Sequence, residues 1–378
     1  MKKKVLFVGT VLQGHMLLFH LPCMQWFQQQ GYEVHLACHN DLDHEVTEVP
    51  FCDRYFNLPF ARSPFNKRNL GVYRQLKRLV DENEYALIHC HTPVGSMLGR
   101  LSARKARKKG TKVVYSAHGF HFFKGAPLKN WLLFYPVEWL AARWTDLLIT
   151  TNEEDAQRAE RLPAVKKVKV NGVGVDLTRF DPPVDRREAR DLLGIPQDAQ
   201  VLLTVGEHSV RKNHATLLKA AAQLPGVQVV LCGWGEGKPE LERLTDELGI
   251  RERVQFLGFR NDLPKVYPAA DVFVFPSLHE GLPVALMEAM ACGLPAVVSN
   301  ARGCVDLITQ EEGGFLRDPM DVDGFAKDIH VLLEDPALRE RMGAANRVTM
   351  QGYSLPDVME KMAVLYREQL DQSVRSDS

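Results

Sequence analysis

Short apolar runs alternate with amphipathic stretches along the chain. The run Val5 to Thr10 is followed by a predicted helix over 17–30, which ends before Gly31, and by a second apolar run over 32–38. Because strands of a parallel sheet are buried on both faces, they read as continuous apolar runs. The order therefore predicts a strand–helix–strand unit. The first turn has no G-x-G-x-x-G motif, so a dinucleotide oxidoreductase is weakly supported.

The same alternation continues to residue 151 and restarts at residue 201. Further strands are predicted over 55–58, 86–91, 112–117, 146–151, 201–206, 227–232, 254–259, 271–275 and 295–299. Further helices are predicted over 70–80, 153–160, 215–223, 239–248, 321–333 and 358–370. The segment Asp181-Pro182-Pro183 is typical of a linker. With 378 residues available for two cores, the pattern predicts two doubly wound α/β domains.

The stretch from His279 to Gly293 carries two glutamates eight residues apart. It follows a predicted strand, and Pro283 suits the first turn of a helix. Eight residues make a little over two helical turns, so Glu280 and Glu288 face a similar direction. The free N–H groups of a helix N-terminus attract phosphate, and carboxylates accept hydrogen bonds from sugar hydroxyls. Since Glu288 stands among apolar residues, we also expect it to have a polar partner.

Two sequence motifs carry a resemblance to a known family. The segments EGLP and EAMACGLPAV, within residues 280–297, resemble the paired-glutamate motif of the retaining family-4 glycosyltransferases. The run AHGFHFFKGAP, residues 117–127, is similar to a bacterial subgroup that builds capsular, O-antigen and exopolysaccharide repeat units. The resemblance implies the GT-B fold, with two Rossmann-like domains facing a cleft. It implies an acceptor-binding domain at 1–180 with a returning C-terminal helix at about 356–378, and a donor-binding domain at 181–355.

The resemblance also implies the roles of particular residues. Glu280 would hold the donor sugar, Glu288 the ribose, and His118 the donor sugar from the first domain. Lys212 matches a family lysine, whereas Glu207 stands where the family commonly has arginine, so Arg211 is expected to supply the missing cation. The remaining donor contacts are expected from Gly14, Arg260, Gly281, Leu282 and Pro283.

The resemblance, together with the cations, implies a reaction without a metal or another cofactor. No D-x-D motif is present, so Arg211 and Lys212 are expected to stabilise the leaving diphosphate. No nucleophile is identifiable, which favours front-face transfer with retention. We expect a UDP-linked donor and a hexosyl or N-acetylhexosaminyl group, with a polyprenyl-diphosphate-linked sugar or an oligosaccharide as acceptor. A nucleotide-sugar epimerase and a non-catalytic nucleotide-sugar-binding protein remain as alternatives.

Histidines stand at the ends of two predicted strands. His89 and His91 alternate along one strand and could bind a metal. Strand-end histidines more often satisfy loop backbone groups, so we expect that role and no metal site. His121 is a weaker candidate than His118 for contact with the donor sugar.

The net charge of zero conceals an asymmetry. Residues 1–150 hold 20 Lys and Arg against 11 Asp and Glu, a net +9, and the remainder carries −9. A basic run at 100–109 precedes an aromatic segment at 120–144. This combination favours an anionic membrane surface, bound through Arg104, Lys105, Lys108 and Lys109. The alternative is that the aromatics fill the core and the cations are merely solvated. No nucleic-acid recognition motif accompanies the charge.

The cysteines and the hydropathy bear on location. Seven cysteines are scattered with no C-x-x-C pair, which favours reduced thiols in the cytoplasm. The apolar run after Met1 is too short for a signal peptide or a membrane span. We therefore expect a cytoplasmic protein that is peripheral on the inner face of the cell membrane.

Overall fold

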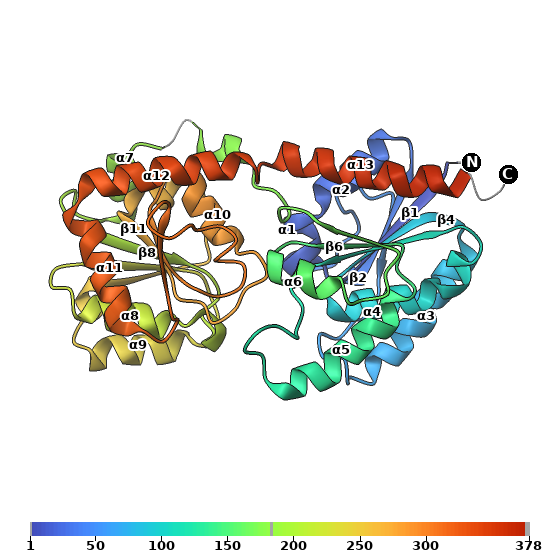
Figure 1. The fold of residues 1–378 in the computed structure, drawn as a ribbon, viewed down its shortest axis with the longest axis horizontal. Helices are drawn as coiled ribbons and strands as arrows, with labels where there is room; N and C mark the ends of the chain where they lie inside the picture. Colours follow the sequence, from blue (N-terminus) through green and yellow to red (C-terminus); the bar gives the residue numbers. More distant parts are fainter. Residues whose placement is uncertain (1, 182–183, 375–378) are drawn as a thin grey trace. The chain divides into compact units, whose positions relative to one another are not determined.

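A computed structural model of the chain describes residues 2–181 and 184–374, and it consists of two α/β units (Figure 1). The first unit comprises residues 1–173 and 356–378, and the second comprises residues 174–355. Each contains one parallel sheet with helices packed on it, so the predicted doubly wound class is confirmed. The unit boundary precedes the predicted one by seven residues, because Val175 pairs with Ser354 and Phe180 packs in the second core.

The first unit has a seven-stranded sheet in the order β3-β2-β1-β4-β5-β6-β7. Its strands are β1 (Lys4–Val11), β2 (Glu33–His39), β3 (Arg54–Asn57), β4 (Tyr85–His91), β5 (Lys112–Ala117), β6 (Leu147–Thr150) and β7 (Lys166–Lys169). Its helices are η1 (Leu12–Met16), α1 (Leu17–Phe19), α2 (Leu21–Gln29), α3 (Arg68–Glu82), α4 (Pro93–Arg107), α5 (Leu128–Ala142) and α6 (Glu153–Ala159).

The second unit has a six-stranded sheet in the order β10-β9-β8-β11-β12-β13. Its strands are β8 (Val201–Val205), β9 (Gln228–Cys232), β10 (Val254–Gly258), β11 (Val272–Phe275), β12 (Ala296–Ser299) and β13 (Gly314–Arg317). Its α-helices are α7 (Arg186–Leu193), α8 (His214–Ala222), α9 (Lys238–Glu247), α10 (Val284–Ala291), α11 (Val322–Glu334) and α12 (Pro336–Gln351). Short 3₁₀ turns are η2 (Leu177–Phe180), η3 (Val210–Lys212), η4 (Arg251–Arg253), η5 (Leu263–Lys265) and η6 (Tyr267–Ala269).

In both sheets the chain starts at a central strand, and the direction in which it adds further strands reverses once. In the first unit the chain moves outward from β1 to β3 and then crosses back to β4. In the second it moves from β8 to β10 and then crosses back to β11. Ligands of open parallel sheets bind beyond the carboxyl ends of the strands at such a reversal. The fold therefore directs attention to the loops after β1 and β4, and to those after β8 and β11.

The C-terminal helix α13 (Leu355–Val374) packs on the first sheet, as the family resemblance implies. The ring of Tyr366 lies 4.6 Å from that of Phe27. The Tyr366 hydroxyl lies 3.0 Å from Nδ1 of His89 in β4. This helix thus completes the core of the first unit from the far end of the sequence.

Several predicted elements differ from the observed ones. The predicted helix over 17–30 is broken into α1 and α2 at His20, since Pro22 stands in the first turn of α2 and lacks the N–H that a continuous helix needs. Strand β7 was not predicted, because its sequence Lys-Lys-Val-Lys lacks an apolar run. Strand β13 and helices α5, α7 and α12 were also not predicted.

No helix within residues 2–181 and 184–374 is long and apolar enough to cross a membrane. All seven cysteines are free thiols, and five of them are buried. Burial raises the pKa of Cys23 to about 11 and that of Cys90 to about 12. These thiols are therefore packing residues rather than nucleophiles at neutral pH.

Candidate active site

The second unit joins three predicted site residues around one carboxylate. Glu280 follows β11, and Arg211 and Lys212 follow β8 across the reversal point. Oε1 of Glu280 accepts hydrogen bonds from Lys212 Nζ at 2.8 Å, from Arg211 Nη1 at 2.7 Å and from Ser277 Oγ at 2.6 Å. The hydrogen bonds found between this carboxylate and the described residues all end on Oε1. Oε2 is therefore available to accept a hydrogen bond from a ligand hydroxyl.

The two cations differ in their surroundings. The Lys212 side chain is 10% exposed, and its ammonium group lies 4.5 Å from the centre of the Phe275 ring. The Arg211 side chain is 35% exposed. Burial by itself would raise the pKa of Glu280, but the charges of Lys212 and Arg211 outweigh it and hold this pKa below its ordinary value. The site therefore holds an ionised carboxylate between two cations at neutral pH.

Glu288 lies on the buried face of α10 and has the polar partners that its apolar neighbours predict. Its Oε2 lies 3.0 Å from the hydroxyl of Tyr267, and its Oε1 lies 3.7 Å from Nη1 of Arg179. Burial raises the pKa of Glu288, and the Tyr267 hydrogen bond and the Arg179 charge offset only part of this rise. The predicted polar partner is thus confirmed, while neither Tyr267 nor Arg179 was predicted.

The loop before α10 is fixed by contacts with Arg302 and Gly303, which follow β12. Nε of Arg302 donates to the backbone oxygen of Glu280 at 2.7 Å. A side chain at Gly303 would meet the backbone oxygen of Gly281 at 2.4 Å, so only glycine permits this approach. The loop exposes part of Gly281 and Leu282, whereas Pro283 is buried and caps the helix.

Arg260 follows β10, and its guanidinium is engaged by a neighbour. Nε and Nη2 donate to the two carboxylate oxygens of Asp262 at 2.7 and 2.6 Å. This fork fixes the side chain in the loop after β10, the edge strand that pairs with β9. The structure therefore places Arg260 in the second unit with Glu280 and Glu288, but shows no bond between it and either glutamate.

Gly14 lies in η1, after β1, and its backbone is already bonded. The N–H groups of Gln13 and Gly14 donate to the carboxylate of Asp41 at 2.7 and 3.2 Å. Gly14 also borders a pocket of about 470 Å³ in the first unit, shared with Arg62, Met97 and Val137. An anionic diphosphate bound at the N–H groups of Gln13 and Gly14 would have to displace the carboxylate of Asp41.

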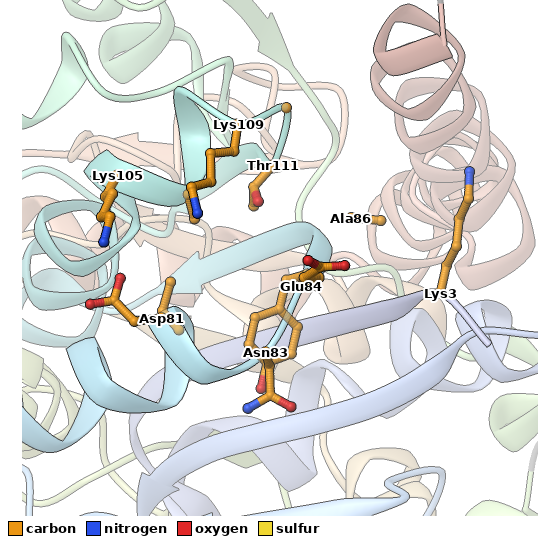
Figure 2. Close-up of a pocket in the computed structure, with 12 residues that line it drawn as sticks. Lys3, Asp81, Asn83, Glu84, Ala86, Lys105, Lys109 and Thr111 are labelled. Carbon is orange, nitrogen blue, oxygen red and sulfur yellow. The ribbon is translucent and has the colours of Figure 1, made fainter. Parts of the chain in front are cut away.

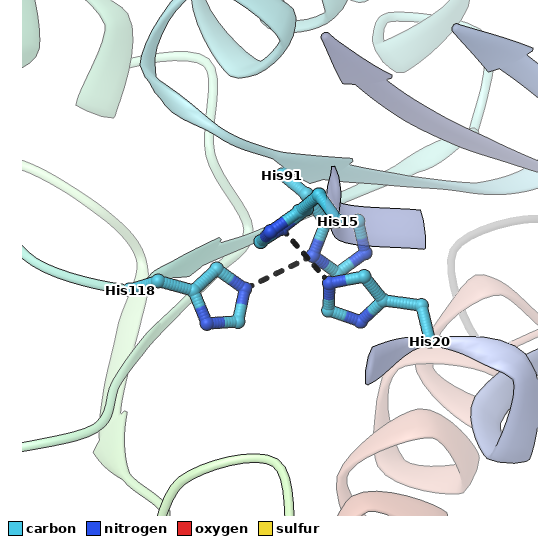
Figure 3. A group of neighbouring side chains, drawn as sticks. All are labelled: His15, His20, His91 and His118. Atoms are coloured by element: carbon cyan, nitrogen blue, oxygen red, sulfur yellow. Dashed lines mark hydrogen bonds between the residues drawn. The ribbon is translucent and has the colours of Figure 1, made fainter. Parts of the chain in front are cut away.

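His118, after β5, belongs to a histidine group that the sequence did not predict (Figure 3). Its Nε2 lies 3.5 Å from Nδ1 of His91, and His15 and His20 complete the group. Burial lowers the pKa of His118 to about 4. His121 lies outside the group and borders the 470 Å³ pocket.

The predicted role of the β4 histidines was wrong. His89 lies 2.9 Å from the hydroxyl of Ser116 and 3.0 Å from that of Tyr366, so its partners are side chains rather than loop backbone. His91 instead faces other imidazoles. The sequence could not show this, because the partners lie far away in the chain.

The basic run lies at the opposite edge of the first sheet. Helix α4 starts after β4 and returns toward the start of β5, so its C-terminal end lies at the amino ends of the strands. Arg104, Lys105, Lys108 and Lys109 are exposed there. Figure 2 shows Lys105 and Lys109 beside a pocket of about 580 Å³ that also includes Asp81 and Glu84. These four cations cannot share a ligand with residues at the carboxyl ends of the strands.

The aromatic segment is divided between core and surface. Phe120 and Phe122 are buried in the core of the first unit, and Trp131, Phe134 and Tyr135 pack against it. Arg100, in the basic run, is buried as well and pairs with Glu138. The expectation that this segment is a surface was therefore wrong for Phe120 and Phe122, which fill the core, and the other three aromatic side chains are only half-exposed beside it.

The outward face of α5 is apolar. Its large exposed side chains recur at helical spacing and are Leu128, Leu132, Leu133, Val137, Trp139 and Leu140. The cations Lys124, Lys129 and Arg143 are exposed beside them. Contiguous apolar surface of this kind marks an interaction site, and the neighbouring cations favour an anionic partner. We call these six side chains the α5 apolar face.

Two Rossmann-like units and a paired-glutamate site define a glycosyltransferase of the GT-B class. The family model of group 1 glycosyl transferases matches residues 185–349, and that of glycosyl transferase 4-like proteins matches residues 4–152. The chain belongs to this family, the family-4 glycosyltransferases, as its sequence predicts.

Relatives of the chain carry names that agree with the family. The relative EpsD of Bacillus subtilis (strain 168) is 42% identical over the whole of both chains. A relative from Escherichia coli is named UDP-Gal:alpha-D-GlcNAc-diphosphoundecaprenol alpha-1,3-galactosyltransferase. It is 30% identical, over 79% of this chain and 81% of its own. Among solved structures, HepE from Anabaena in complex with UDP and glucose has a TM-score of 0.80 and 21% identity, over 97% of this chain and all of its own.

Proposed function

We propose that this protein transfers a hexosyl or N-acetylhexosaminyl group from a UDP-sugar, with retention, to a polyprenyl-diphosphate-linked sugar in bacterial surface polysaccharide synthesis. The observation that carries the proposal is the Glu280 carboxylate, which holds Lys212 and Arg211 through one oxygen and leaves the other open. The names of the Escherichia coli relative and of HepE support the acceptor class and the UDP donor.

The proposed chemistry needs no metal at the diphosphate. The bond between the anomeric carbon and the diphosphate oxygen breaks on the same face on which the acceptor hydroxyl attacks. The hydroxyl proton passes to the departing diphosphate oxygen. Lys212 and Arg211 stabilise the charge that develops on that diphosphate. Glu280 Oε2 accepts a hydrogen bond from a hydroxyl of the transferred sugar and orients it.

The pocket of the first unit suits the acceptor. Its lining combines apolar side chains, among them Met97, Leu98 and Phe134, with the exposed guanidinium of Arg62. A lipid-linked sugar diphosphate presents an apolar chain and an anion, which match these two parts. Val137 belongs both to this pocket and to the α5 apolar face, so a lipid bound at that face would reach the pocket.

The activity is tested with a panel of radiolabelled UDP-sugars and short-chain undecaprenyl-diphosphate sugars. The proposal expects a new lipid-linked disaccharide whose anomeric configuration, read by NMR, matches that of the donor. Isomerisation of the donor without an acceptor would show an epimerase. Tight UDP-sugar binding without turnover of any donor and acceptor in the panel would show a binding protein.

We further propose that the α5 apolar face docks on the anionic cytoplasmic membrane surface. Each large apolar side chain that leaves water contributes about 1.5–3 kcal/mol, and each cation near the surface about 1 kcal/mol. In vesicle co-sedimentation, Leu132→Glu with Leu133→Glu should release the protein from anionic vesicles. Val348→Glu, which alters an equally exposed side chain of α12, should not.

The basic cluster at the end of α4 provides a second test. Charge reversal of Lys105 and Lys109 should leave binding unchanged if α5 is the docking face. Release by this change but not by the leucine changes would instead locate docking at α4. Wild-type protein that fails to pellet with anionic vesicles at low salt would refute membrane docking.

A further inference from the structure

Four imidazoles converge at the carboxyl edge of the first sheet. One ring nitrogen from each of His15, His20, His91 and His118 lies within 4.8 Å of the other three. They come from η1, from the residue before α2, and from the ends of β4 and β5. Figure 3 shows the four rings turned toward one another. The fold therefore brings together histidines that are up to about a hundred residues apart in the chain.

The spacing of these nitrogens suits a tetrahedral transition metal. Zinc binds imidazole nitrogen at 2.0–2.1 Å, so two ligands of a tetrahedral site lie about 3.4 Å apart. Nε2 of His15 and Nε2 of His20 lie 3.0 Å apart, and Nε2 of His118 and Nδ1 of His91 lie 3.5 Å apart. Small rotations of the rings would equalise these separations around one ion.

Hydrogen bonding alone leaves this group incompletely satisfied. Nε2 of His91 is buried and has no hydrogen-bond partner among the described residues. This nitrogen lies across the ring from Nδ1, which faces His118, so an ion bound through Nδ1 would fix the ring tautomer with its proton on Nε2. No carboxylate of the described residues joins the four rings, so a protonated cluster would have no counter-charge in it. Neutral imidazole is the form that binds metals.

Neighbouring side chains pack against the ring of His91 and hold it in place. The ring of His89 lies 4.0 Å from that of His91 and is itself held by Ser116 and Tyr366. The ring of Phe7 stacks on His91 from the sheet. Because His15 and His118 are only partly buried, an ion could enter from solvent.

We propose that His15, His20, His91 and His118 bind one Zn²⁺ ion. The ion would tie η1 to the ends of β4 and β5 and so fix the wall of the 470 Å³ pocket, which His15 borders. Imidazole ligands select zinc and similar metals over Mg²⁺ and Mn²⁺. The four histidines belong to the first unit and Lys212 and Arg211 to the second, and the zinc proposal does not depend on the proposed function.

The test uses full-length protein without a histidine tag, stripped by a chelator and then titrated with Zn²⁺ and, separately, with Co²⁺. We expect one Zn²⁺ per chain by mass spectrometry of the metal, a rise in Tm, and the intense visible absorption of tetrahedral Co²⁺. Absence of stoichiometric Zn²⁺, or only the weak absorption of octahedral Co²⁺, would overturn the proposal.

Substitutions assign the ligands. His15→Ala and His118→Ala should each weaken Zn²⁺ binding by about tenfold or more, since each removes one of four ligands. His121→Ala is the matched control, because this nearby histidine lies outside the group, and its binding should stay within about twofold of wild type. Equal Zn²⁺ affinity in wild type, His15→Ala and His118→Ala would show that any bound metal sits elsewhere.

Discussion

Replacement of Lys212 by methionine tests the centre of the proposed site. The ammonium group lies 2.8 Å from Glu280 and is largely buried. Two unit charges at that distance attract by about 6 kcal/mol at an effective dielectric of about 20, of which desolvation offsets the larger part. Loss of one such contact to a transition state costs about 2.7–4 kcal/mol. We therefore expect kcat/KM to fall by about 10²- to 10³-fold, at 1.36 kcal/mol per factor of ten.

Arg211→Met should cost less, about tenfold, because that guanidinium is more exposed and more strongly screened. The fold of both variants should survive, since Glu280 keeps Ser277 and one cation. Initial rates with the donor and acceptor found in the panel give kcat and KM, and circular dichroism with urea unfolding checks the fold.

Lys219→Met is the matched control, because it removes an exposed lysine of α8 a short distance along the chain. It should leave kcat/KM within about twofold of wild type. A folded Lys212→Met enzyme within about threefold of wild type would refute the role of this cation. So would a larger loss in Arg211→Met than in Lys212→Met.

Three further predictions follow from the second unit. Transfer in chelator-treated buffer should not rise when Mg²⁺ or Mn²⁺ is added, and stimulation of about tenfold or more would show a metal at the diphosphate. Tyr267→Phe should lower the free energy of unfolding in urea by about 1–3 kcal/mol at pH 8 and by less at pH 5, because the raised pKa of Glu288 favours its neutral form as pH falls. Burial, with the charges of His208 and Lys212, lowers the pKa of His214 to about 3. Since His214 is protonated more readily in the unfolded chain, its contribution to the free energy of unfolding is full above pH 6.5 and falls by about 1.4 kcal/mol per pH unit toward pH 3. His214→Gln should remove this contribution to the pH dependence of the free energy of unfolding between pH 6 and 4.

The sequence by itself determined the architecture and one half of the site. Apolar runs such as 5–8 and 201–205 are buried strands in both cases, because a two-sided parallel sheet leaves that signature in any chain. The motif around Glu280 and Glu288 is local, so its spacing on a strand–loop–helix unit could be read directly. Lys212 was found by its place after a strand.

Only the tertiary structure decided the partners of these groups. Ser277 supports Glu280 from the same loop, whereas Tyr267 and Arg302 support the two glutamates from other segments, and nothing in their own sequence marks them. The exposure of α5 could not be read from its composition, since apolar residues stand on nearly all sides of this helix and their pattern does not indicate which face meets solvent. The histidine group is the clearest case. Its members meet because the carboxyl ends of parallel strands that are distant in sequence share one edge, and that proximity is a property of the sheet.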